Sequence, residues 1–499
     1  MFSFHAGVPA VGEIVERAGD LGLPAVALTD TDRMSGLILH YLECRKAGIR
    51  PLLGVELTEP DPGEREAVRR GGASGVPVPA HRARGAAGRT QCPKVLLLAR
   101  NAEGYGDLCR IVTDRHLAAA DFSFARTFAR EWPNLFLLTA DPGLLQLLAA
   151  GPDRGRLFGE LVRNSAFTRA RSAALAAAAG SLGLPLAASN DSFFLDPGDW
   201  QVHRVLTAVG LNSTLSRLRP GEAAPRAALL ASPGRMEELF ADCPEALANT
   251  REIAAACDVE LELNQWIMPR AAVPPGHTPE SRLAALAAAG LEANYGGRSA
   301  ALRERARQLQ AMELGVISRL GYASYFLIVK EIRDWANERF RGGYRRPADC
   351  TILRGSAANS ITFYNIGVSD LDPIRYDLYF QRFLNEDRAS PPDADLDFGW
   401  DERELVYDFM VDRWGAERVA VTGTTIHFRA RAAFRETAKV FGYTDDQVTA
   451  ILESRKTRTQ RIEDGEIAML WRLARRLEGK PRYMGQHPGG VLIANGPIS

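Results

Sequence analysis

The stretch PPDADLDF, residues 391–398, alternates acidic with apolar residues. In an extended strand successive side chains point to opposite faces, so the aspartates share one face while the apolar residues face a core. These acidic residues are Asp393, Asp395 and Asp397. Like charges about 7 Å apart repel, and Asp is disfavoured in strands, so the pattern calls for a compensating cation. Mg²⁺ prefers carboxylate oxygens, which predicts a metal site; the solvent-exposed face of an edge strand is the alternative.

A loop of small residues, RGSAANS at 354–360, stands upstream of this acidic stretch. Backbone N–H groups of such a loop at a helix start can bind phosphate, and the Arg354 guanidinium adds a fork of donors. Arg382 and Arg388 lie just before the acidic stretch and are further candidates for phosphate contacts. The alternatives are a tight turn for the loop and simple solvation for the arginines. The order of loop, arginines and alternating aspartates is the layout of a nucleotidyl-transfer site.

The bulk composition limits the classes of partner. The chain has 499 residues, so about three domains are expected. Lys and Arg total 61, as do Asp and Glu, so nucleic-acid contacts must come from local patches. The six cysteines include no CxxC pair, which argues against a zinc site and a disulfide framework and favours a reducing cytosol. With no apolar run of about 20 residues and no secretory signal, we expect a cytoplasmic protein without membrane contact.

Alternating helices and short apolar strands in the first part of the chain predict an α/β domain with a largely parallel sheet or barrel. Strands are expected at residues 24–30, 51–57, 94–100, 134–140 and 185–191. A segment rich in Gly, Pro, Ala and Arg, at about 58–91, is expected to be a flexible insertion. After about residue 260 the pattern becomes helical, with Thr278 as an N-cap, and after about residue 427 it is helical and rich in Arg.

Several long motifs occur together, in one order, along this chain. They resemble the bacterial C-family DNA polymerases, that is, the DNA polymerase III alpha subunit and its relatives, over nearly the whole length. RGSAANS and PPDADLDF are most similar to the error-prone, damage-induced branch of that family. The motifs that carry the resemblance are LFADCPEALANTREIA (239–254), GYASYFLIV (321–329), RGSAANSITFYNIGVSDLDPIRYDLYFQRFLNEDR (354–388), PPDADLDF (391–398) and QHPGGVLIA (486–494).

The resemblance implies a multidomain α/β fold and an activity. A polymerase-and-histidinol-phosphatase (PHP) domain, a β/α barrel, is implied for residues 1–262, and a nucleotidyltransferase-like palm for 263–426. An inserted helical thumb at 427–485 and the start of a returning palm segment at 486–499 would follow. The implied activity is template-directed DNA synthesis from primer-template DNA and deoxynucleoside triphosphates, in replication, repair and lesion bypass. A missing C-terminal half would meet a sliding clamp and other mutasome components.

The resemblance also implies site residues. The palm aspartates of the family fall on Asp395 and Asp397, with Asp393 as a supporting acid. The glycine-serine motif for the incoming triphosphate falls on Gly355 and Ser356. Two Mg²⁺ ions at the palm aspartates would activate the primer 3′-hydroxyl and stabilise the pyrophosphate leaving group. The alternative is a non-catalytic remnant that binds DNA or a polymerase.

The chain departs from the family pattern at several positions. The third palm carboxylate is expected after QHPGG, where no acidic residue occurs up to Ser499, so we expect this chain alone to be inactive. The first histidine motif of the PHP domain is missing, and Thr31 and Phe193 stand where metal-binding relatives carry His. The remaining candidate ligands are Asp30, Glu56, Asp191 and His203. We interpret them as ordinary strand-end acids and a surface histidine, and expect neither a PHP metal nor PHP hydrolase activity.

Local basic clusters are the candidate contacts to the DNA backbone, because they can neutralise phosphates without reading sequence. The main cluster lies on one expected helix and comprises Arg429, Arg431, Arg435 and Lys439. Other clusters surround FRGGYRR (340–346) or comprise Arg455, Lys456, Arg458 and Arg461. The alternative for each cluster is a solvated helix face. His487 has no metal-ligand spacing to another His or Cys and is expected to shape a turn.

Overall fold

The computed structural model describes residues 6–60, 65–66, 93–263, 265–340, 351–387, 391–456 and 465–498. The chain divides into two compact units. The first comprises Met1–Leu261 with Gly423–Gly485, and the second comprises Glu262–Thr422 with Gln486–Ile498. The insertion expected at about 58–91 lies almost wholly outside the described residues.

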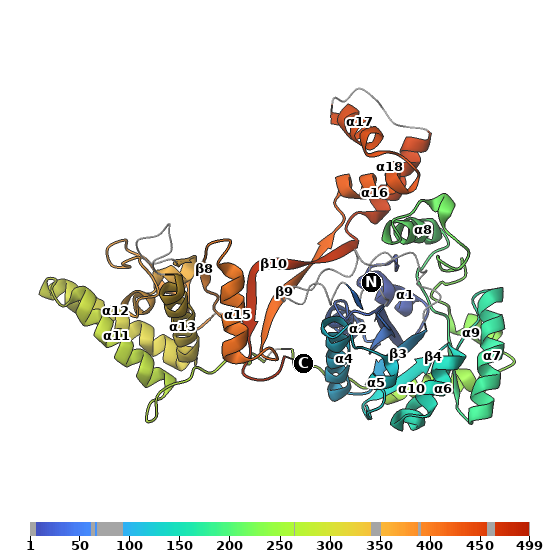
Figure 1. Ribbon diagram of the computed structural model, residues 1–499, viewed down its shortest axis with the longest axis horizontal. Helices are drawn as coiled ribbons and strands as arrows, with labels where there is room; N and C mark the ends of the chain where they lie inside the picture. The colour runs from blue at the N-terminus through green and yellow to red at the C-terminus, as the bar shows by residue number, and fades with distance from the viewer. Residues whose placement is uncertain are drawn as a thin grey trace. The chain divides into compact units, whose positions relative to one another are not determined.

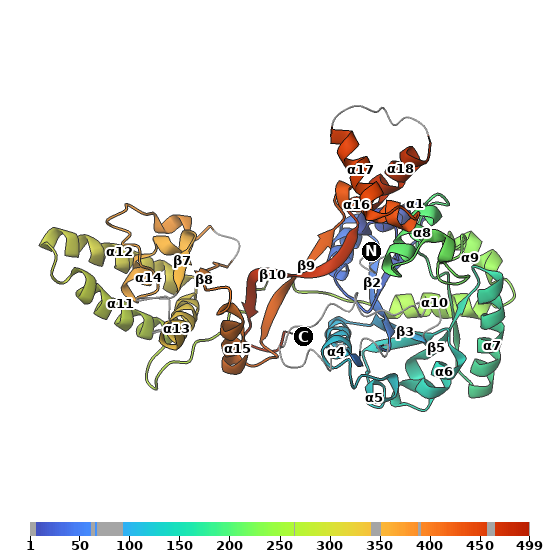
Figure 2. The same cartoon turned by 45° about the horizontal axis from the view of Figure 1, so that its top comes forward.

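A curled, open six-stranded sheet organises the first unit (Figure 1, Figure 2). Its strands, adjacent in chain order, are β1 (Ala25–Thr31), β2 (Arg50–Thr58), β3 (Lys94–Ala99), β4 (Leu135–Thr139), β5 (Leu157–Val162) and β6 (Leu186–Ser189). β3 runs antiparallel to both neighbours, and the other pairs are parallel. The strands expected from the sequence are all present. β5 was missed because Gly159 and Glu160 interrupt its apolar run.

The helices of this part pack mainly on one face of the sheet. They are α1 (Val11–Asp20), α2 (Leu37–Ala47), α4 (Ala102–Leu117), α5 (Phe124–Thr127), α6 (Pro142–Ala149), α7 (Ala166–Leu182), α8 (Asp199–Gly210), α9 (Pro233–Leu239) and α10 (Pro244–Ala256). Alternation along β3 separates the two faces, because Val95 and Leu97 are buried in the main core. Leu96 and Leu98 belong to a smaller cluster on the other face, which leaves room there for a cavity.

The first unit also contains a helical segment from late in the chain. Its helices are α16 (Ala430–Val440), α17 (Asp445–Lys456) and α18 (Glu466–Leu477). The strands β9 (Val419–His427) and β10 (Pro481–Ile493) pair with each other and are divided between the two units, since Val419–Thr422 and Gln486–Ile493 belong to the second. Phe434 of α16 and Leu470 of α18 share one hydrophobic core with Val205 of α8. The turn expected at His487 is wrong, because β10 continues through that residue while paired with β9.

The second unit is mainly helical around a short strand pair. Its elements are α11 (Pro279–Tyr295), α12 (Ala300–Arg319), α13 (Ala323–Phe340), β7 (Ile352–Arg354), α14 (Ile361–Asn365), β8 (Asp395–Asp397) and α15 (Arg403–Trp414). The Thr278 side chain accepts a hydrogen bond from the Ser281 amide, which confirms the expected N-cap. Phe326 and Phe363 stack with ring centroids 4.1 Å apart and anchor the core beneath the strand pair.

Gly290 allows α11 to lie directly on α14. A Cβ atom at this position would come within 1.6 Å of the Asn365 carbonyl oxygen, so no other residue fits without moving one of the helices. Among the described residues, no single helix is long and apolar enough to cross a membrane; only α12 with α13, bent by 110°, passes that test as a pair.

Candidate active site

The acidic stretch and the small-residue loop meet in the second unit. β7 pairs antiparallel with β8, and the register sets Arg354 opposite Asp395 and Leu353 opposite Leu396. Leu353 is buried and Leu396 packs against the same core, while Asp395 is exposed on the other face. The alternation predicted from the sequence is therefore present. The structure brings Arg354 and the aspartates together from positions some forty residues apart.

An ion pair joins the two strands. Arg354 Nε lies 2.5 Å from Asp397 Oδ2, and the two side chains are 62% and 46% exposed. Exposed pairs of this kind contribute about 0–1 kcal/mol, because water screens them and both side chains lose freedom. The guanidinium can therefore leave Asp397 at little cost when a stronger cation or a phosphate is available.

Gly355 brings the loop close to the Asp395 carboxylate. Its φ of +70° is strained for any residue with a Cβ, and a Cβ here would lie 2.9 Å from Asp395 Oδ2. Ser356 follows directly and begins the short 3-10 helix η4 (Ser356–Asn359). The loop thus reaches the acidic strand through a position where only glycine fits.

A buried carboxylate that the sequence does not reveal holds the end of this loop. Glu313 of α12 accepts hydrogen bonds from Ser360 Oγ at 2.7 Å, Ile361 N at 2.9 Å and Thr362 N at 2.9 Å. Burial raises the pKa of Glu313 to about 7, although these hydrogen bonds act in the opposite direction. Glu313 therefore caps α14 and fixes the segment that follows the loop. Its position in α12 looks like any other polar helix position, so only the tertiary structure shows this role.

The other predicted nucleotide contacts are less closely placed. Arg382 ends the 3-10 helix η5 (Phe380–Arg382) and is exposed, and Arg388 lies outside the described residues. Asp393 is exposed and lies two residues before the start of β8. Trp400, which the sequence analysis did not single out, is 89% exposed shortly after β8.

The aspartates of β8 suit Mg²⁺ by their chemistry. Asp395 and Asp397 present hard oxygen ligands on one face of β8, and Mg²⁺ sites usually combine one or two carboxylates with substrate phosphates. Across the part of the chain that the structure describes, no group of three or more His, Cys, Asp or Glu side chains is arranged to hold a metal ion. Any metal at β8 therefore needs ligands beyond these protein side chains.

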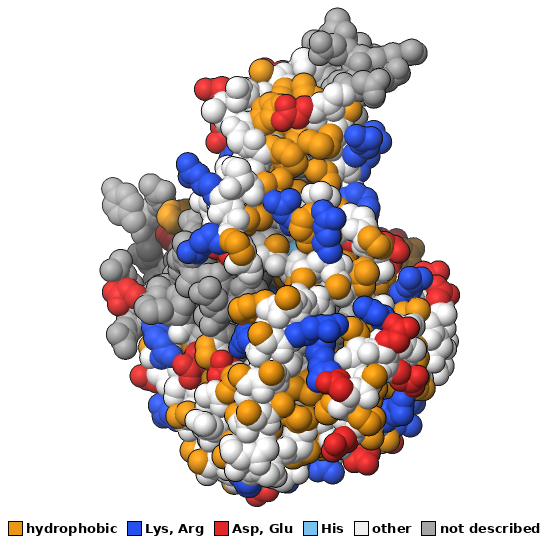
Figure 3. Space-filling view, turned by 90° about the vertical axis from the view of Figure 1, so that its right-hand side faces the viewer, with side chains coloured by type: hydrophobic (Ala, Val, Ile, Leu, Met, Phe, Trp, Pro, Cys, Tyr) orange, Lys and Arg blue, Asp and Glu red, His pale blue; other side chains and the backbone are white. Residues whose placement is uncertain are grey.

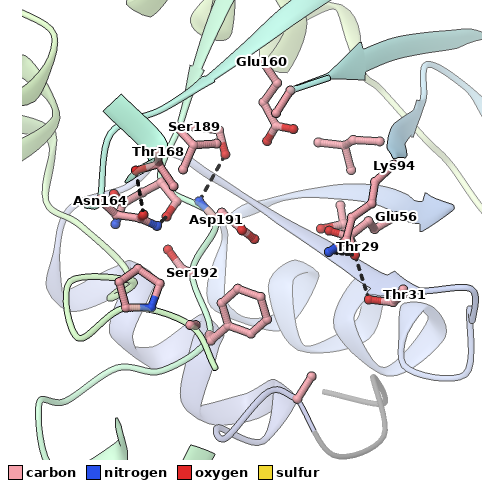
Figure 4. A pocket seen from close by; sticks show the side chains of 18 of the residues that line it. Thr29, Thr31, Glu56, Lys94, Glu160, Asn164, Thr168, Ser189, Asp191 and Ser192 are labelled. Carbon is pink, nitrogen blue, oxygen red and sulfur yellow. Dashed lines mark hydrogen bonds and ion pairs between the residues drawn. The ribbon is translucent and has the colours of Figure 1, made fainter. Parts of the chain in front are cut away.

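A cavity of about 1290 Å³ lies in the first unit, against the sheet face opposite the main core (Figure 4). Glu56 of β2, Glu160 of β5 and Asp191, which follows β6, line it. Lys94, the first residue of β3, places its Nζ atom 2.7 Å from Glu56 Oε1. Thr31 Oγ1 donates to the same Glu56 oxygen at 2.9 Å. This cluster of charges on neighbouring strands was not anticipated as a unit.

The pKa values of two carboxyl groups in the cavity, Glu160 and Asp191, are raised, which favours their neutral forms. Withdrawal from bulk water, together with the nearby Asp191 charge, raises the pKa of Glu160 to about 7. Withdrawal from water likewise raises the pKa of Asp191 to about 6, while the nearby Lys94 charge opposes this rise. Lys94 is therefore electrostatically coupled to Glu160 and Asp191 as well as paired with Glu56.

Of the remaining PHP candidates, His203 also lines the cavity, whereas Asp30 does not. Asp30 is fully buried and, unlike its neighbours Thr29 and Thr31, does not line the cavity. His203 is 2% exposed, so the interpretation of it as a surface residue is wrong.

His203 is committed to backbone contacts. Its Nδ1 atom lies 2.7 Å from the Ala6 carbonyl oxygen, and its Nε2 atom accepts the Ala224 amide at 2.8 Å. Burial lowers the pKa of His203, and Phe193 packs against its ring. With both ring nitrogens engaged, His203 has none left for a metal.

The main basic cluster is divided between solvent and an acidic partner. Arg431 lies on α16, and Arg429 is its N-cap residue; both are exposed. Arg435 Nη1 and Lys439 Nζ each lie 2.9 Å from Asp445 Oδ1 at the start of α17. Figure 3 shows basic side chains scattered among apolar and acidic ones on one face of the molecule. Within this cluster, Arg429 and Arg431 are thus the more available for phosphates; Arg341, Arg345, Arg346, Arg458 and Arg461 lie outside the described residues.

Comparison with known proteins defines the class of the two parts. Residues 1–178 match the PHP domain, and residues 281–499 match the bacterial DNA polymerase III alpha NTPase domain. The chain belongs to the family of bacterial DNA polymerase III alpha subunits and error-prone DNA polymerases. The fold class expected from the sequence, a PHP domain followed by a further mixed α/β part, is confirmed.

Several relatives match the whole chain. An error-prone DNA polymerase of Nocardia farcinica is 33% identical, and the match covers 100% of this chain and 47% of that protein. An error-prone DNA polymerase of Pseudomonas paraeruginosa is 31% identical, with 100% and 46% covered. The DNA polymerase III subunit alpha of Escherichia coli is 30% identical, with 99% and 43% covered. The chain thus spans somewhat less than half the length of these relatives.

Proposed function

We propose that this chain carries the nucleotidyl-transfer site of a template-directed DNA polymerase of the error-prone type. Its substrates would be primer-template DNA and deoxynucleoside triphosphates. The observation that carries the proposal is the strand pair in which Arg354 and Gly355 contact the face of β8 that bears Asp395 and Asp397. Family membership supports it, since the relatives that match the whole chain are named DNA polymerases.

In this proposal the aspartates bind the metal, and Arg354 and the loop at Gly355 bind the phosphates. Asp395 and Asp397 would hold Mg²⁺, which when bound supplies a Lewis acid for the attacking hydroxyl and the leaving phosphate oxygens. Arg354 would turn from Asp397 to the triphosphate, because an exposed ion pair is easily exchanged for a charge-assisted contact with phosphate. The loop at Gly355 and Ser356 would offer backbone N–H groups and a hydroxyl to the same phosphates.

The finer parts of the proposal concern biological role. Lesion bypass and repair synthesis follow from the error-prone branch, which RGSAANS and PPDADLDF resemble most. A sliding clamp and other mutasome components would be partners of the complete polymerase, and the cytoplasm its location. The parts named palm and thumb would be residues 263–426 and 427–485. The cavity of the PHP domain takes no part in nucleotidyl transfer in this proposal.

A non-catalytic DNA-binding protein is the second candidate, favoured by the exposed Arg429 and Arg431 at the start of α16. Fluorescence anisotropy of a labelled primer-template separates the two. For a polymerase site, the nucleotide that matches the template should strengthen DNA binding in Mg²⁺, and Asp395→Ala should abolish this gain. Asp412→Ala, which removes an exposed carboxylate of α15, is the matched control and should retain it.

The remnant gives a different pattern in the same assay. Its DNA binding would weaken with salt and with Arg429→Gln and Arg431→Gln, since phosphate contacts release counterions. It would respond neither to the nucleotide nor to Asp395→Ala. A gain from the matching nucleotide that survives Asp395→Ala would reject the site at β8.

A further inference from the structure

We propose that the Lys94 ammonium is the resident counter-ion of the PHP cavity, so that this domain folds and persists without a metal ion there. A PHP domain implies metal ions at this place, and the residues present do not fit them. The inference concerns the first unit alone and is independent of the polymerase proposal. It rests on which side chains line the cavity and on the ion pair between two of them, Lys94 and Glu56.

The described side chains around the cavity do not form a set of metal ligands. Glu56 and Asp191 line the cavity, but Asp30 does not, and both ring nitrogens of His203 are bonded to backbone atoms. Thr31, at a position where a ligand would be expected, instead donates a hydrogen bond to Glu56. Among the described residues no cluster of metal-binding side chains is formed.

Lys94 lines the cavity and is placed there by the pairing of β3 with β2. β3 begins at Lys94, and pairing with Thr58 of β2 sets this residue at the edge of the cavity beside the strand that carries Glu56. The ammonium lies 2.7 Å from Glu56 Oε1, and the Lys94 and Glu56 side chains are 26% and 18% exposed. A pair this sheltered is screened less than a surface pair, and removing one partner leaves an uncompensated charge.

Several carboxyl groups line the same cavity as the Lys94 ammonium. Figure 4 shows Glu56, Glu160 and Asp191 around the same space that Lys94 enters. Lys94 lowers the pKa of Glu160 and of Asp191, against the effect of burial on both. One ammonium therefore offsets repulsion among several carboxylates, which is the electrostatic part of what a bound divalent cation would do.

The charge-removing variant Lys94→Met, with Lys94→Arg as the charge-keeping control, tests the inference. Both are made with Asp395→Asn and Asp397→Asn, so that metal binding at β8 cannot contribute. Thermal unfolding of the whole chain is followed in EDTA and in MnCl₂, and bound manganese is measured after dialysis. The parent should unfold at the same temperature in both buffers and retain no manganese.

The expected changes follow from the pairing. Lys94→Met should lower the midpoint in EDTA by about 3–6 °C, while Lys94→Arg should stay close to the parent. MnCl₂ should recover part of the loss in Lys94→Met, because a divalent cation can then enter between the carboxylates. Adding Glu56→Gln to Lys94→Met should raise the midpoint again, since it removes the charge left unpaired, and this holds even if Lys94→Met alone fails to fold.

Either of two results would overturn the proposal. One is manganese bound by the parent and lost on Asp191→Asn, which would make the cavity a metal site. The other is a Lys94→Met variant as stable as the parent in EDTA, or one that Glu56→Gln does not rescue. Both results leave the nucleotide-binding proposal untouched, because the aspartates of β8 are neutralised throughout.

Discussion

The two carboxylate clusters of this chain differ in how their charge is balanced. In the PHP cavity, Glu56 is 18% exposed and is paired with Lys94, which is fixed at the start of a central strand. On β8, Asp397 is 46% exposed and its partner Arg354 is 62% exposed. A sheltered pair resists exchange, whereas an exposed pair is cheap to separate. The comparison indicates a fixed counter-ion in the first cluster and an exchangeable one, suited to substrate and metal, in the second.

Glu313 extends the comparison to a buried carboxylate balanced by hydrogen bonds alone. Glu313→Ala should lower the free energy of unfolding of the second unit by about 3 kcal/mol, because it leaves buried backbone and hydroxyl donors without an acceptor. Urea unfolding measures this loss. Glu304→Ala, at an exposed position of the same helix, is the control and should change it by less than about 0.5 kcal/mol. Equal effects of the two changes would mean that Glu313 does not hold the loop.

The pH dependence of the free energy of unfolding tests the environment of Glu160 in the cavity. The pKa of Glu160 in the folded protein, raised to about 7, lies above its ordinary value, so the folded state binds the proton more tightly. Its contribution to stability is therefore full below about pH 4.5 and is lost as the pH rises through about 7. Glu160→Gln should remove up to about 3 kcal/mol of this decline, as one pKa unit corresponds to about 1.4 kcal/mol. Unfolding free energies of both proteins across that pH window measure it; identical slopes would contradict the shift.

Gly355 tests the approach of the loop to β8. Gly355→Ala adds a Cβ 2.9 Å from Asp395 Oδ2 at a φ of +70°, which should weaken Mg²⁺-dependent nucleotide binding about 10-fold. Gly321→Ala, also at positive φ but with open space around it, is the control for strain alone. If both variants bind nucleotide equally well, contact between the loop and Asp395 has no part in binding.

Arg354 should give the smallest effect on stability. Because its pair with Asp397 is exposed, Arg354→Gln should change the free energy of unfolding by less than about 1 kcal/mol. The same change at Lys94 should cost more, since that pair is sheltered. The comparison between the two clusters would be reversed if Arg354→Gln proved the more damaging of the two in urea unfolding.

The sequence predicts the local parts of this fold well, because apolar alternation and helix caps are local signals. Five of the six strands of the PHP sheet, the Thr278 cap and the alternation at β8 are present as predicted. The packing of α16 on α8 was not foreseen, since it joins segments about two hundred residues apart. The turn predicted at His487 failed for a similar reason, because pairing with β9 keeps that segment extended.

The sequence identifies the candidate site only in part. The aspartates of β8 and the loop at Gly355 carry a recognisable pattern, and the structure brings them together. Lys94 and Glu313 carry none, because their importance comes from partners on other elements. His203 shows the opposite error, since a histidine on a helix was taken as a surface residue although its ring closes a buried backbone contact.

Calorimetric titration of this chain with a deoxynucleoside triphosphate, with and without Mg²⁺, tests the site at β8 most directly. We predict Mg²⁺-dependent binding that is weakened at least about 10-fold by Asp395→Asn with Asp397→Asn, and retained by Asp412→Asn on α15. Binding of equal strength in the parent and the double variant would contradict the proposal that these aspartates hold the metal and nucleotide.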